Sequence, residues 1–391
     1  MPRLIGPALL TLLTVVAVLA SGGQAAASHV QCGDVITKDT TLDSDLIDCP
    51  GDGIVIGASD ITLDLGGHTV KGNAVGPGGL WTYGIANGDY ERFTVRDGTL
   101  RDFYVGVGIG NVTDIALRGL RIRDSHGPGI WLSETHSGLI EGNVVTGFQS
   151  AILVLAERIV LRNNVFSGNG GYGIHAFDAG DNRIERNIVS RNGGDGIHGF
   201  GMGSTLMQGN VIVTNGGAGI STDDGSTDNR IDGNRIWDNG GAGVSMAAGA
   251  HQNRLEGNSV LRNGATGILL SYGNGNEFRK NRVVGNSAGG IVLSGEGVYD
   301  NLIEANHVQR SGGDGIYLGP ETGDNAVRRN FTLGNGDDGV DSDSAFNTIA
   351  RNVGVRNGDL GIEAVAGVTD GGGNRAFANG NPLQCVVVVC R

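Results

Sequence analysis

The sequence has a deficit of positive charge. Its 28 lysines and arginines are outnumbered by 41 aspartates and glutamates, so the formal net charge is −13. A protein with this charge repels polyanions, and neither nucleic acid nor an anionic membrane surface is an expected partner. Direct binding of a polyuronate would likewise need a local basic patch or a bridging divalent cation.

Cysteine is almost absent, and none lies in the central part of the chain. The four cysteines form two local pairs near the ends, Cys32 with Cys49 and Cys385 with Cys390. Zinc binding is disfavoured because these pairs lie far apart in the sequence and lack histidines at ligand spacing. In an exported chain the spacing predicts disulfides Cys32–Cys49 and Cys385–Cys390 that tie down the two end segments.

Long hydrophobic runs are missing outside the first residues. Residues 1–27 combine Arg3, an apolar stretch from Leu4 to Ala20, and an Ala-x-Ala site before Ser28. This pattern predicts a signal peptide and a secreted, extracellular protein, with an N-terminal membrane anchor as the alternative. No other segment is long and apolar enough to span a bilayer, so we expect no membrane span after signal removal.

Uninterrupted amphipathic runs long enough for a helix are also missing, and a short repeat takes their place. A Gly-Ile or Gly-Val element returns every 21 to 25 residues, and a period of this size indicates stacked structural repeats. The branched residues of this element are Ile85, Ile109, Ile130, Ile152, Ile174, Ile197, Ile220, Val244, Ile268, Ile291, Ile316, Val340 and Ile362.

Each repeat holds three short apolar segments, each followed by a Gly or Asn cluster. Three strands joined by tight turns fit one coil of a parallel β-helix, in which successive coils stack about 4.8 Å apart. Leucine-rich repeats have a similar period but need a helical return that this sequence lacks. We interpret many of the 72 glycines as corner residues.

Asparagine recurs at one turn of the repeat. Amides stacked in register can hydrogen-bond along the ladder, and we expect Asn at this turn because it tolerates the left-handed conformation. The recurring residues are Asn164, Asn187, Asn210, Asn234, Asn258, Asn281, Asn306 and Asn330.

The repeat defines the expected domain organisation. Residues 28–53 are predicted to form an N-terminal cap, residues 54–365 about thirteen coils, and residues 366–391 a C-terminal cap. We expect the protein to be a monomer. Residues 73–92 are irregular and predict a loop. Val386 to Val389 would leave an exposed strand edge unless the Cys385–Cys390 loop folds them over the last coil.

These Asn- and Gly-Ile-containing coils resemble the right-handed parallel β-helix repeats of the pectate-lyase-like superfamily. The resemblance covers about 54–365 and implies an all-β, right-handed, three-faced parallel β-helix. Members of this superfamily include polysaccharide lyases, glycosidases, mannuronan epimerases, copper-insertion proteins and proteins without catalysis. The repeat is a scaffold, so the resemblance specifies the fold far better than the function.

If the Ile of each Gly-Ile strand points inward, the next residue points outward, and one outward cluster has catalytic residue types. His175 and His198 should stack one coil apart, near 5 Å. Together with Asp195 and Asp223 they could transfer protons, while aromatic rings hold the sugar. The predicted sugar-binding residues are Tyr172, Phe177, Phe200 and Trp131. The alternative is that these residues are ordinary surface side chains without a function, arising from variation among the repeats.

A second outward cluster is rich in carboxylates. Asp338, Asp341 and Asp343 are the predicted metal ligands, because crowded carboxylates raise one another's pKa or bind a hard cation such as Ca²⁺. Asp337-Asp338 matches the Asp-Asp pair of polygalacturonases in form. The Gly-His-Gly and Arg-x-Lys motifs of that family are absent, so its catalytic roles are not carried over. Solvated surface carboxylates are the alternative.

The sequence leaves three functions open. The first is binding of an extracellular polysaccharide or cell-surface glycan, with cleavage or epimerisation by lyase, epimerase or hydrolase chemistry. The second is a non-catalytic extracellular scaffold or binding protein. The third is periplasmic copper handling, for which His175 with His198 is the only soft-ligand pair and Met202, Met207 and Met246 show no grouping.

Overall fold

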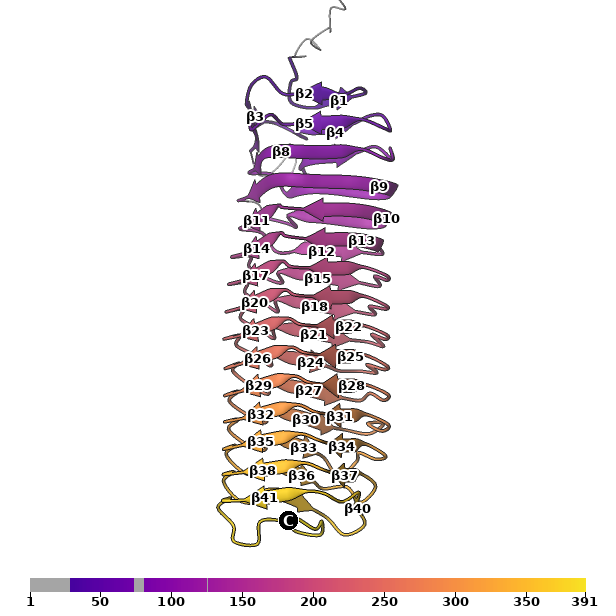
Figure 1. Ribbon diagram of the computed structural model, residues 1–391. Coiled ribbons are helices and arrows are strands. Elements are labelled where there is room, and N and C mark those ends of the chain that lie inside the picture. Colours follow the sequence, from indigo (N-terminus) through magenta and orange to yellow (C-terminus); the bar gives the residue numbers. More distant parts are fainter. Residues whose placement is uncertain (1–28, 74–80, 125) are drawn as a thin grey trace, which may run out of the picture.

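The computed structural model describes residues 29–73, 81–124 and 126–391, which form a parallel β-solenoid of about 14 turns (Figure 1). Within these residues all regular structure is strand, as the repeat predicted. No helix in this part of the chain is long and apolar enough to cross a membrane. The predicted signal peptide, residues 1–27, lies outside the described residues.

Three parallel sheets form the sides of the solenoid, because each coil contributes one strand to each sheet. Three long strands turn corners without interruption: β8 (Thr94–Arg101) joins sheets 2 and 3, β10 (Ile130–Glu141) joins sheets 1 and 2, and β9 (Val105–Arg123) runs through all three. Every other strand belongs to one sheet.

Sheet 1 carries the Gly-Ile element of each coil. Its remaining strands are β1 (Asp34–Ile36), β4 (Ile54–Ile56), β7 (Tyr83–Asn87), β12 (Ala151–Val154), β15 (Ile174–Phe177), β18 (Ile197–Phe200), β21 (Ile220–Asp223), β24 (Val244–Met246), β27 (Ile268–Ser271), β30 (Ile291–Ser294), β33 (Ile316–Leu318), β36 (Val340–Ser342) and β39 (Ile362–Ala364).

Sheet 2 follows sheet 1 in every coil. Its remaining strands are β2 (Thr40–Thr41), β5 (Thr62–Asp64), β13 (Glu157–Arg162), β16 (Arg183–Glu185), β19 (Leu206–Gln208), β22 (Arg230–Asp232), β25 (Arg254–Glu256), β28 (Glu277–Arg279), β31 (Leu302–Glu304), β34 (Ala326–Arg328), β37 (Thr348–Ala350) and β40 (Thr369–Asp370).

Sheet 3 closes the coil. Its remaining strands are β3 (Leu46–Cys49), β6 (Thr69–Gly72), β11 (Val144–Thr146), β14 (Val165–Ser167), β17 (Ile188–Ser190), β20 (Val211–Val213), β23 (Arg235–Trp237), β26 (Ser259–Leu261), β29 (Arg282–Val284), β32 (His307–Gln309), β35 (Phe331–Leu333), β38 (Val353–Val355) and β41 (Arg375–Phe377).

The core is a set of apolar columns that run along the axis. Ile197, Ile220 and Val244 are paired in register on sheet 1 and are fully buried. The glycine before each of them is needed for space: a Cβ on Gly219 would lie 2.3 Å from Cγ2 of Ile236 and 2.6 Å from the carbonyl oxygen of Gly243. This glycine therefore permits close packing of coils, a role that the corner interpretation missed.

The asparagine column is confirmed as a hydrogen-bonded ladder. Asn210 Nδ2 donates to Asn234 Oδ1 at 3.0 Å, and the backbone N–H of Asn210 donates to the same oxygen at 2.9 Å. Its Nδ2 also donates to the Ile184 carbonyl at 2.7 Å. Two further ladders, through Asn192 and Asn215 and through Asn253 and Asn276, use the same pattern at the other corners.

The expected left-handed conformation falls one residue earlier than the asparagine. Arg186, Gly209 and Gly233 precede ladder asparagines and have φ of 52°, 64° and 61°. The left-handed residue turns the chain, and the asparagine after it is free to point its amide inward. Placing the left-handed conformation on the asparagine itself was therefore wrong.

The coils extend beyond the expected bounds of 54–365 at both ends. Within the predicted N-terminal cap, β1 to β3 pair in parallel with β4 to β6. After residue 365, β40 and β41 pair with β37 and β38. The predicted loop at 73–92 is interrupted by β7, which pairs with β4 and β9, and residues 74–80 lie outside the described residues.

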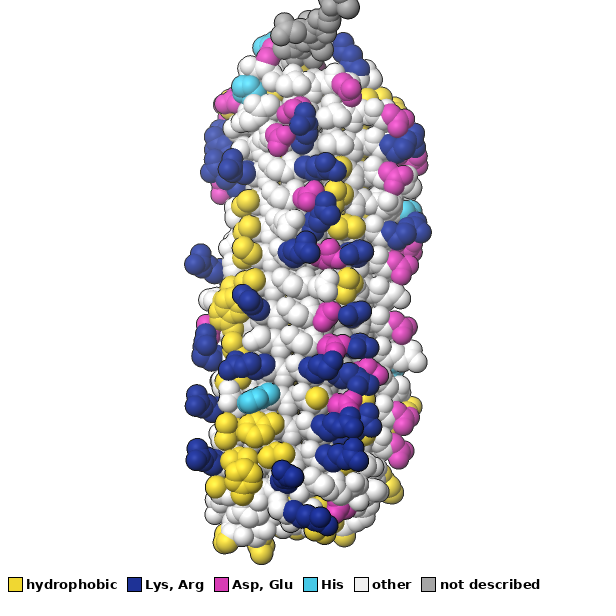
Figure 2. Space-filling model, viewed as in Figure 1, with side chains coloured by type: hydrophobic (Ala, Val, Ile, Leu, Met, Phe, Trp, Pro, Cys, Tyr) yellow, Lys and Arg dark blue, Asp and Glu magenta, His cyan; other side chains and the backbone are white. Residues whose placement is uncertain are grey.

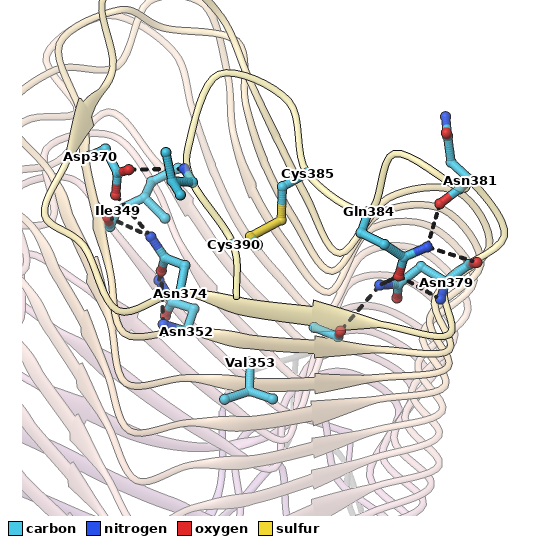
Figure 3. The surroundings of a disulfide bond; sticks show 12 residues. Ile349, Asn352, Val353, Asp370, Asn374, Asn379, Asn381, Gln384, Cys385 and Cys390 are labelled. Carbon is cyan, nitrogen blue, oxygen red and sulfur yellow. Dashed lines mark hydrogen bonds between the residues drawn. A yellow bond between two sulfur atoms is a disulfide. The ribbon is translucent and has the colours of Figure 1, made fainter.

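Both predicted disulfides are present, and each lies at one end of the solenoid. The Cα–Cα distances are 5.3 Å for Cys32–Cys49 and 6.1 Å for Cys385–Cys390. The second disulfide closes a loop over the last coil (Figure 3). In this loop the Val386 N–H donates to the Ile362 carbonyl at 3.0 Å. Val388 is buried there, whereas Val387 and Val389 are exposed, so the loop lies over the last coil but protects these valines only in part.

The same loop supplies the last acceptor for one asparagine ladder. Asn379 Nδ2 donates to Gln384 Oε1 at 2.9 Å, and the backbone N–H of Asn379 donates to that oxygen at 3.1 Å (Figure 3). A side-chain amide five residues downstream thus takes the place that the asparagine of a further coil would occupy.

We expect Asn234→Ala to destabilise the protein strongly. The substitution leaves the buried N–H and Nδ2 groups of Asn210 without their acceptor, and each unsatisfied buried group costs about 1–3 kcal/mol. Urea unfolding followed by circular dichroism measures the effect. Gln208→Ala, at an exposed position of the same coil as Asn210, is the matched control and should change stability little. Equal stability of the two variants would contradict the assigned role of the ladder.

Candidate functional site

One column of side-chain positions runs along sheet 1 and contains members of both predicted clusters. Strand register aligns these positions rung by rung. The column comprises Ala86, Gly108, Trp131, Ile152, His175, His198, Ser221, Ser245, Leu269, Val292, Tyr317, Asp341 and Glu363. In β12 the aligned residue is Ile152, whereas the Gly-Ile spacing predicts Leu153 at this place.

His198 is held by a carboxylate on the preceding turn. Its Nδ1 lies 3.1 Å from Asp195 Oδ2, and Asp195 Oδ1 accepts the backbone N–H of Ala218 at 2.6 Å. With the proton on Nδ1, this contact orients the ring and leaves Nε2 free to accept a proton. Nε2 lies 3.9 Å from Asp223 Oδ2, so both predicted aspartates contact the histidine.

Two further rings pack against this histidine. Tyr172 stacks on His198 with centroids 4.5 Å apart and planes 10° apart. His175 lies one coil away at 5.2 Å, which confirms the predicted stacking. Burial, reinforced by the neighbouring His198, lowers the pKa of His175 below its usual 6.5, so this ring is neutral at pH 7. The site therefore contains an oriented histidine beside a neutral one.

Phe177 and Phe200 form a flat platform at the edge of these histidines. They stack in register with centroids 4.9 Å apart and planes 2° apart. Phe177 also lies edge-on to His175, at 6.4 Å. We call the seven residues the His–Phe cluster: Tyr172, His175, Phe177, Asp195, His198, Phe200 and Asp223. All seven were predicted, and the structure brings them together.

Trp131, the remaining predicted sugar-binding residue, lies apart from this cluster. It occupies the same column two coils from His175, and it packs edge-to-face on Trp81 at 5.4 Å. Trp81 in turn stacks on Tyr104 at 4.8 Å. A cavity of about 300 Å³ beside Trp131 is lined by Tyr83. This aromatic group was not predicted from the sequence, because Trp81 lies outside the regular repeat.

A larger cavity, of about 520 Å³, opens at the corner between sheets 1 and 2. It is lined by acidic residues that include Glu134, Glu157 and Asp178, and by His136, whose Nδ1 lies 3.5 Å from Glu157 Oε2. Asp178 follows Phe177 directly, so the cavity adjoins the phenylalanine platform. The repeat pattern gave no indication of this cavity because its lining residues come from variable corner positions.

The carboxylate cluster lies further along sheet 1, roughly 29 Å from His198 at six coil spacings. It comprises Asp314, Asp337, Asp338, Asp341, Asp343 and Glu363. Two sets of carboxylate oxygens lie within 4.8 Å of one another, one from Asp314, Asp337 and Asp338 and one from Asp338, Asp341 and Glu363.

Burial and crowding keep part of this cluster protonated. Burial and the adjacent Glu363 raise the pKa of Asp338 to about 8, while burial and the charge of Asp343 raise that of Asp341 to about 7. Asp338 is held in place by the Leu360 N–H, which donates to its Oδ1 at 2.6 Å. The cluster therefore shares protons near neutral pH.

The predicted calcium ligands are only partly gathered into one group. Asp338 and Asp341 belong to one set, with Glu363 in the third place. Asp343 instead accepts the Tyr317 hydroxyl at 2.8 Å, and burial and this bond raise the pKa of Tyr317 to about 12. Carboxylate oxygens suit Ca²⁺, but a cation would have to displace the shared protons. Calcium binding stays a prediction.

We expect Asp338→Asn to stabilise the protein at alkaline pH. The folded-state pKa of about 8 exceeds the ordinary value of 3.8, so the contribution of Asp338 to stability is full below pH 4 and is lost as the pH rises through 8. Removing the titration should raise the melting temperature by about 2 °C or more at pH 9, with a smaller effect at pH 5. Asp324→Asn, at an exposed corner, is the control. A melting temperature lowered equally at both pH values would contradict this assignment.

The family comparison matches most of the chain. The model of the right-handed β-helix region matches residues 105–260, 150–300 and 255–383. No curated protein sequence matches the chain significantly.

Solved structures with similar folds share little sequence with the chain. A mutant of the periplasmic alginate epimerase AlgG is 12% identical over 74% of this chain and 76% of that one, with a TM-score of 0.54. The A-module of the Azotobacter vinelandii mannuronan C-5 epimerase AlgE6 is 14% identical over 90% and 91%, with a TM-score of 0.50. A mutant tailspike protein of E. coli bacteriophage HK620, in complex with a hexasaccharide, is 13% identical over 91% and 73%, with a TM-score of 0.53. With a matching family model over residues 105–383 and this architecture, the chain belongs to the right-handed β-helix family.

Proposed function

We propose that the protein binds an extracellular acidic polysaccharide along sheet 1 and cleaves it by β-elimination at the His–Phe cluster. The observation that carries the proposal is the oriented His198, whose Nδ1 is 3.1 Å from Asp195 and whose Nε2 is 3.9 Å from Asp223, in one cluster with the stacked Phe177 and Phe200. A proton acceptor, an orienting carboxylate and a flat surface for a sugar ring are the parts that such a reaction needs.

In this reaction His198 Nε2 takes the proton from the ring carbon next to the sugar carboxylate. The bond from the neighbouring carbon to the bridging oxygen breaks, and a carbon–carbon double bond forms. The leaving oxygen takes a proton from the Tyr172 hydroxyl or from water. Asp195 orients His198 and stabilises its charged form after proton transfer.

The arrangement favours elimination over epimerisation. Inversion at a ring carbon requires a proton to leave from one side of the sugar and return from the other. The groups of the His–Phe cluster all belong to the surface of sheet 1, so they reach a bound sugar from one side. The alginate epimerase and the hexasaccharide-bound tailspike have the same fold at 12 to 13% identity, which supports a polysaccharide as the ligand.

The carboxylate cluster favours a second candidate reaction, hydrolysis. Asp341, with a pKa raised to about 7, could donate a proton to a glycosidic oxygen, while a neighbouring carboxylate acts as base or nucleophile. Tyr317 lies directly beside these carboxylates through its bond to Asp343. Elimination gives an ultraviolet-absorbing product, whereas hydrolysis gives reducing ends alone, so the two reactions are separable in one assay.

Copper handling receives no support from the side chains. Met202, Met207 and Met246 are fully buried and face the core, away from the two histidines. The disulfides at both ends support an oxidising compartment, and we propose an extracellular location on that ground.

We expect His198→Ala to lower polysaccharide cleavage by at least about 10²-fold, the usual contribution of a positioned general base. Asp195→Asn should lower cleavage less than His198→Ala. The His198 ring then loses its anionic partner but keeps a polar amide at the same position. Cleavage is measured on alginate, polygalacturonate and neutral glycans by two assays, the ultraviolet absorbance of unsaturated products and the release of reducing ends. Circular dichroism checks that each variant is folded.

His68→Ala, at the corner between β5 and β6 and away from both sheet 1 and the later coils of sheet 3, is the matched control and should retain full activity. Full activity in His198→Ala together with a loss in Asp341→Asn would assign the reaction to the carboxylate cluster. Wild-type protein without activity on any polymer would favour the non-catalytic binding role.

A further inference from the structure

Sheet 3 and its flanking corners carry positive charge on a protein whose net charge is −13. From β17 to β41 the strands of sheet 3, each taken with the two residues before it and the one residue after it, hold one acidic residue, Asp238. We call the surface formed by these strands and corners the basic face. Its cationic residues, all exposed, are Arg186, Arg191, Arg235, Arg262, Lys280, Arg282, Arg310, Arg329, Arg351, Arg356 and Arg375.

Most of these cations have no carboxylate partner. Arg262 pairs with Asp238, and Lys280 and Arg329 reach carboxylates on sheet 2. The others form no ion pair with any residue that the structure describes. They are Arg186, Arg191, Arg235, Arg282, Arg310, Arg351, Arg356 and Arg375.

Sheet 2 provides the contrast within the same coils. There Arg183, Arg230 and Arg254 each bond to a carboxylate two residues along the same strand. Figure 2 shows blue side chains with little magenta between them along the lower left of the molecule, where Figure 1 labels β17 to β41. On sheet 2 the positive charge is neutralised locally, whereas on the basic face it remains available to an external anion.

Apolar and aromatic side chains fill the space between these arginines. Most are half-buried, so they lie nearly flush with the sheet and present flat surfaces. They are Ile188, Val211, Val213, Trp237, Leu261, Val284, Phe331, Leu333, Val353 and Phe377. Flat apolar surfaces beside guanidinium groups suit stacking of sugar rings, whereas insertion into a membrane would need side chains that protrude.

The spacing along the axis suits an extended chain. Arg235, Ser259 and Arg282 are aligned in register, so the two arginines lie two coils apart, roughly 9.6 Å. The nine coils of the basic face extend over roughly 38 Å at this spacing. A rigid row of this length can contact several charged units of one polymer at once, and many weak contacts then act together.

We propose that the basic face binds an acidic polysaccharide chain that lies along the solenoid axis. Guanidinium groups bind carboxylate or sulfate oxygens bidentately, and the rings between them stack on the sugar units. The aligned strands supply the local basic patch that the overall charge of the chain does not provide. This surface is separate from sheet 1, so the proposal does not depend on the cleavage reaction.

The test uses the protein without its predicted signal peptide, residues 28–391, and alginate as the probe. Binding is measured by isothermal titration calorimetry at low and high salt, in wild type and in the double variant Arg235→Glu, Arg282→Glu. We expect the double variant to lose at least about tenfold in affinity, and wild-type affinity to fall steeply with salt because counterions are released. Arg118→Glu with Arg158→Glu makes the same charge change outside sheet 3 and is the matched control.

The outcomes separate this proposal from the others. Retained binding in the sheet 3 double variant, or equal loss in the control, would overturn it. Equal affinity for single-stranded DNA of the same charge would show a general polyanion surface in place of a polysaccharide site. Salt-sensitive self-association in sedimentation velocity would identify a second copy as the occupant.

Discussion

The hydrogen bonds between successive coils are the interaction on which the rest of the structure depends. A coil is too small to bury its own apolar residues, and it becomes stable only when neighbours cover both of its sides. At the corners the ladder continues through side chains, because each asparagine amide satisfies backbone groups that no strand pairs. This strict register fixes every outward position, so residues more than 20 positions apart in sequence become direct neighbours.

That constraint also explains which parts of the molecule could be predicted from the sequence. The repeat placed His175 beside His198 and Phe177 beside Phe200, because one coil of uniform length separates each pair. Prediction failed where the coil is irregular. In β12 Ala151 is in register with Ile174, so Ile152 aligns with His175, which counting from Gly-Ile does not predict because this coil has no Gly before Ile152.

Other features depend on three-dimensional detail that a repeat pattern does not contain. The contact of Trp81 with Trp131 joins an irregular segment to a regular one. The hydrogen bond from Tyr317 to Asp343 depends on side-chain orientation, which spacing along the sequence does not give. The basic face is formed by corner residues and strand residues of many coils that lie on one side of the folded protein.

The asparagine ladder has a direction, since each Nδ2 donates to the oxygen of the coil that follows. Gln384 supplies the final acceptor at the C-terminal end of one ladder. A whole coil inserted or removed in the interior would leave every donor and acceptor matched and both disulfides untouched. The length of the rod, and with it the length of polymer it can contact, is therefore free to change by coil duplication while the ends remain as they are.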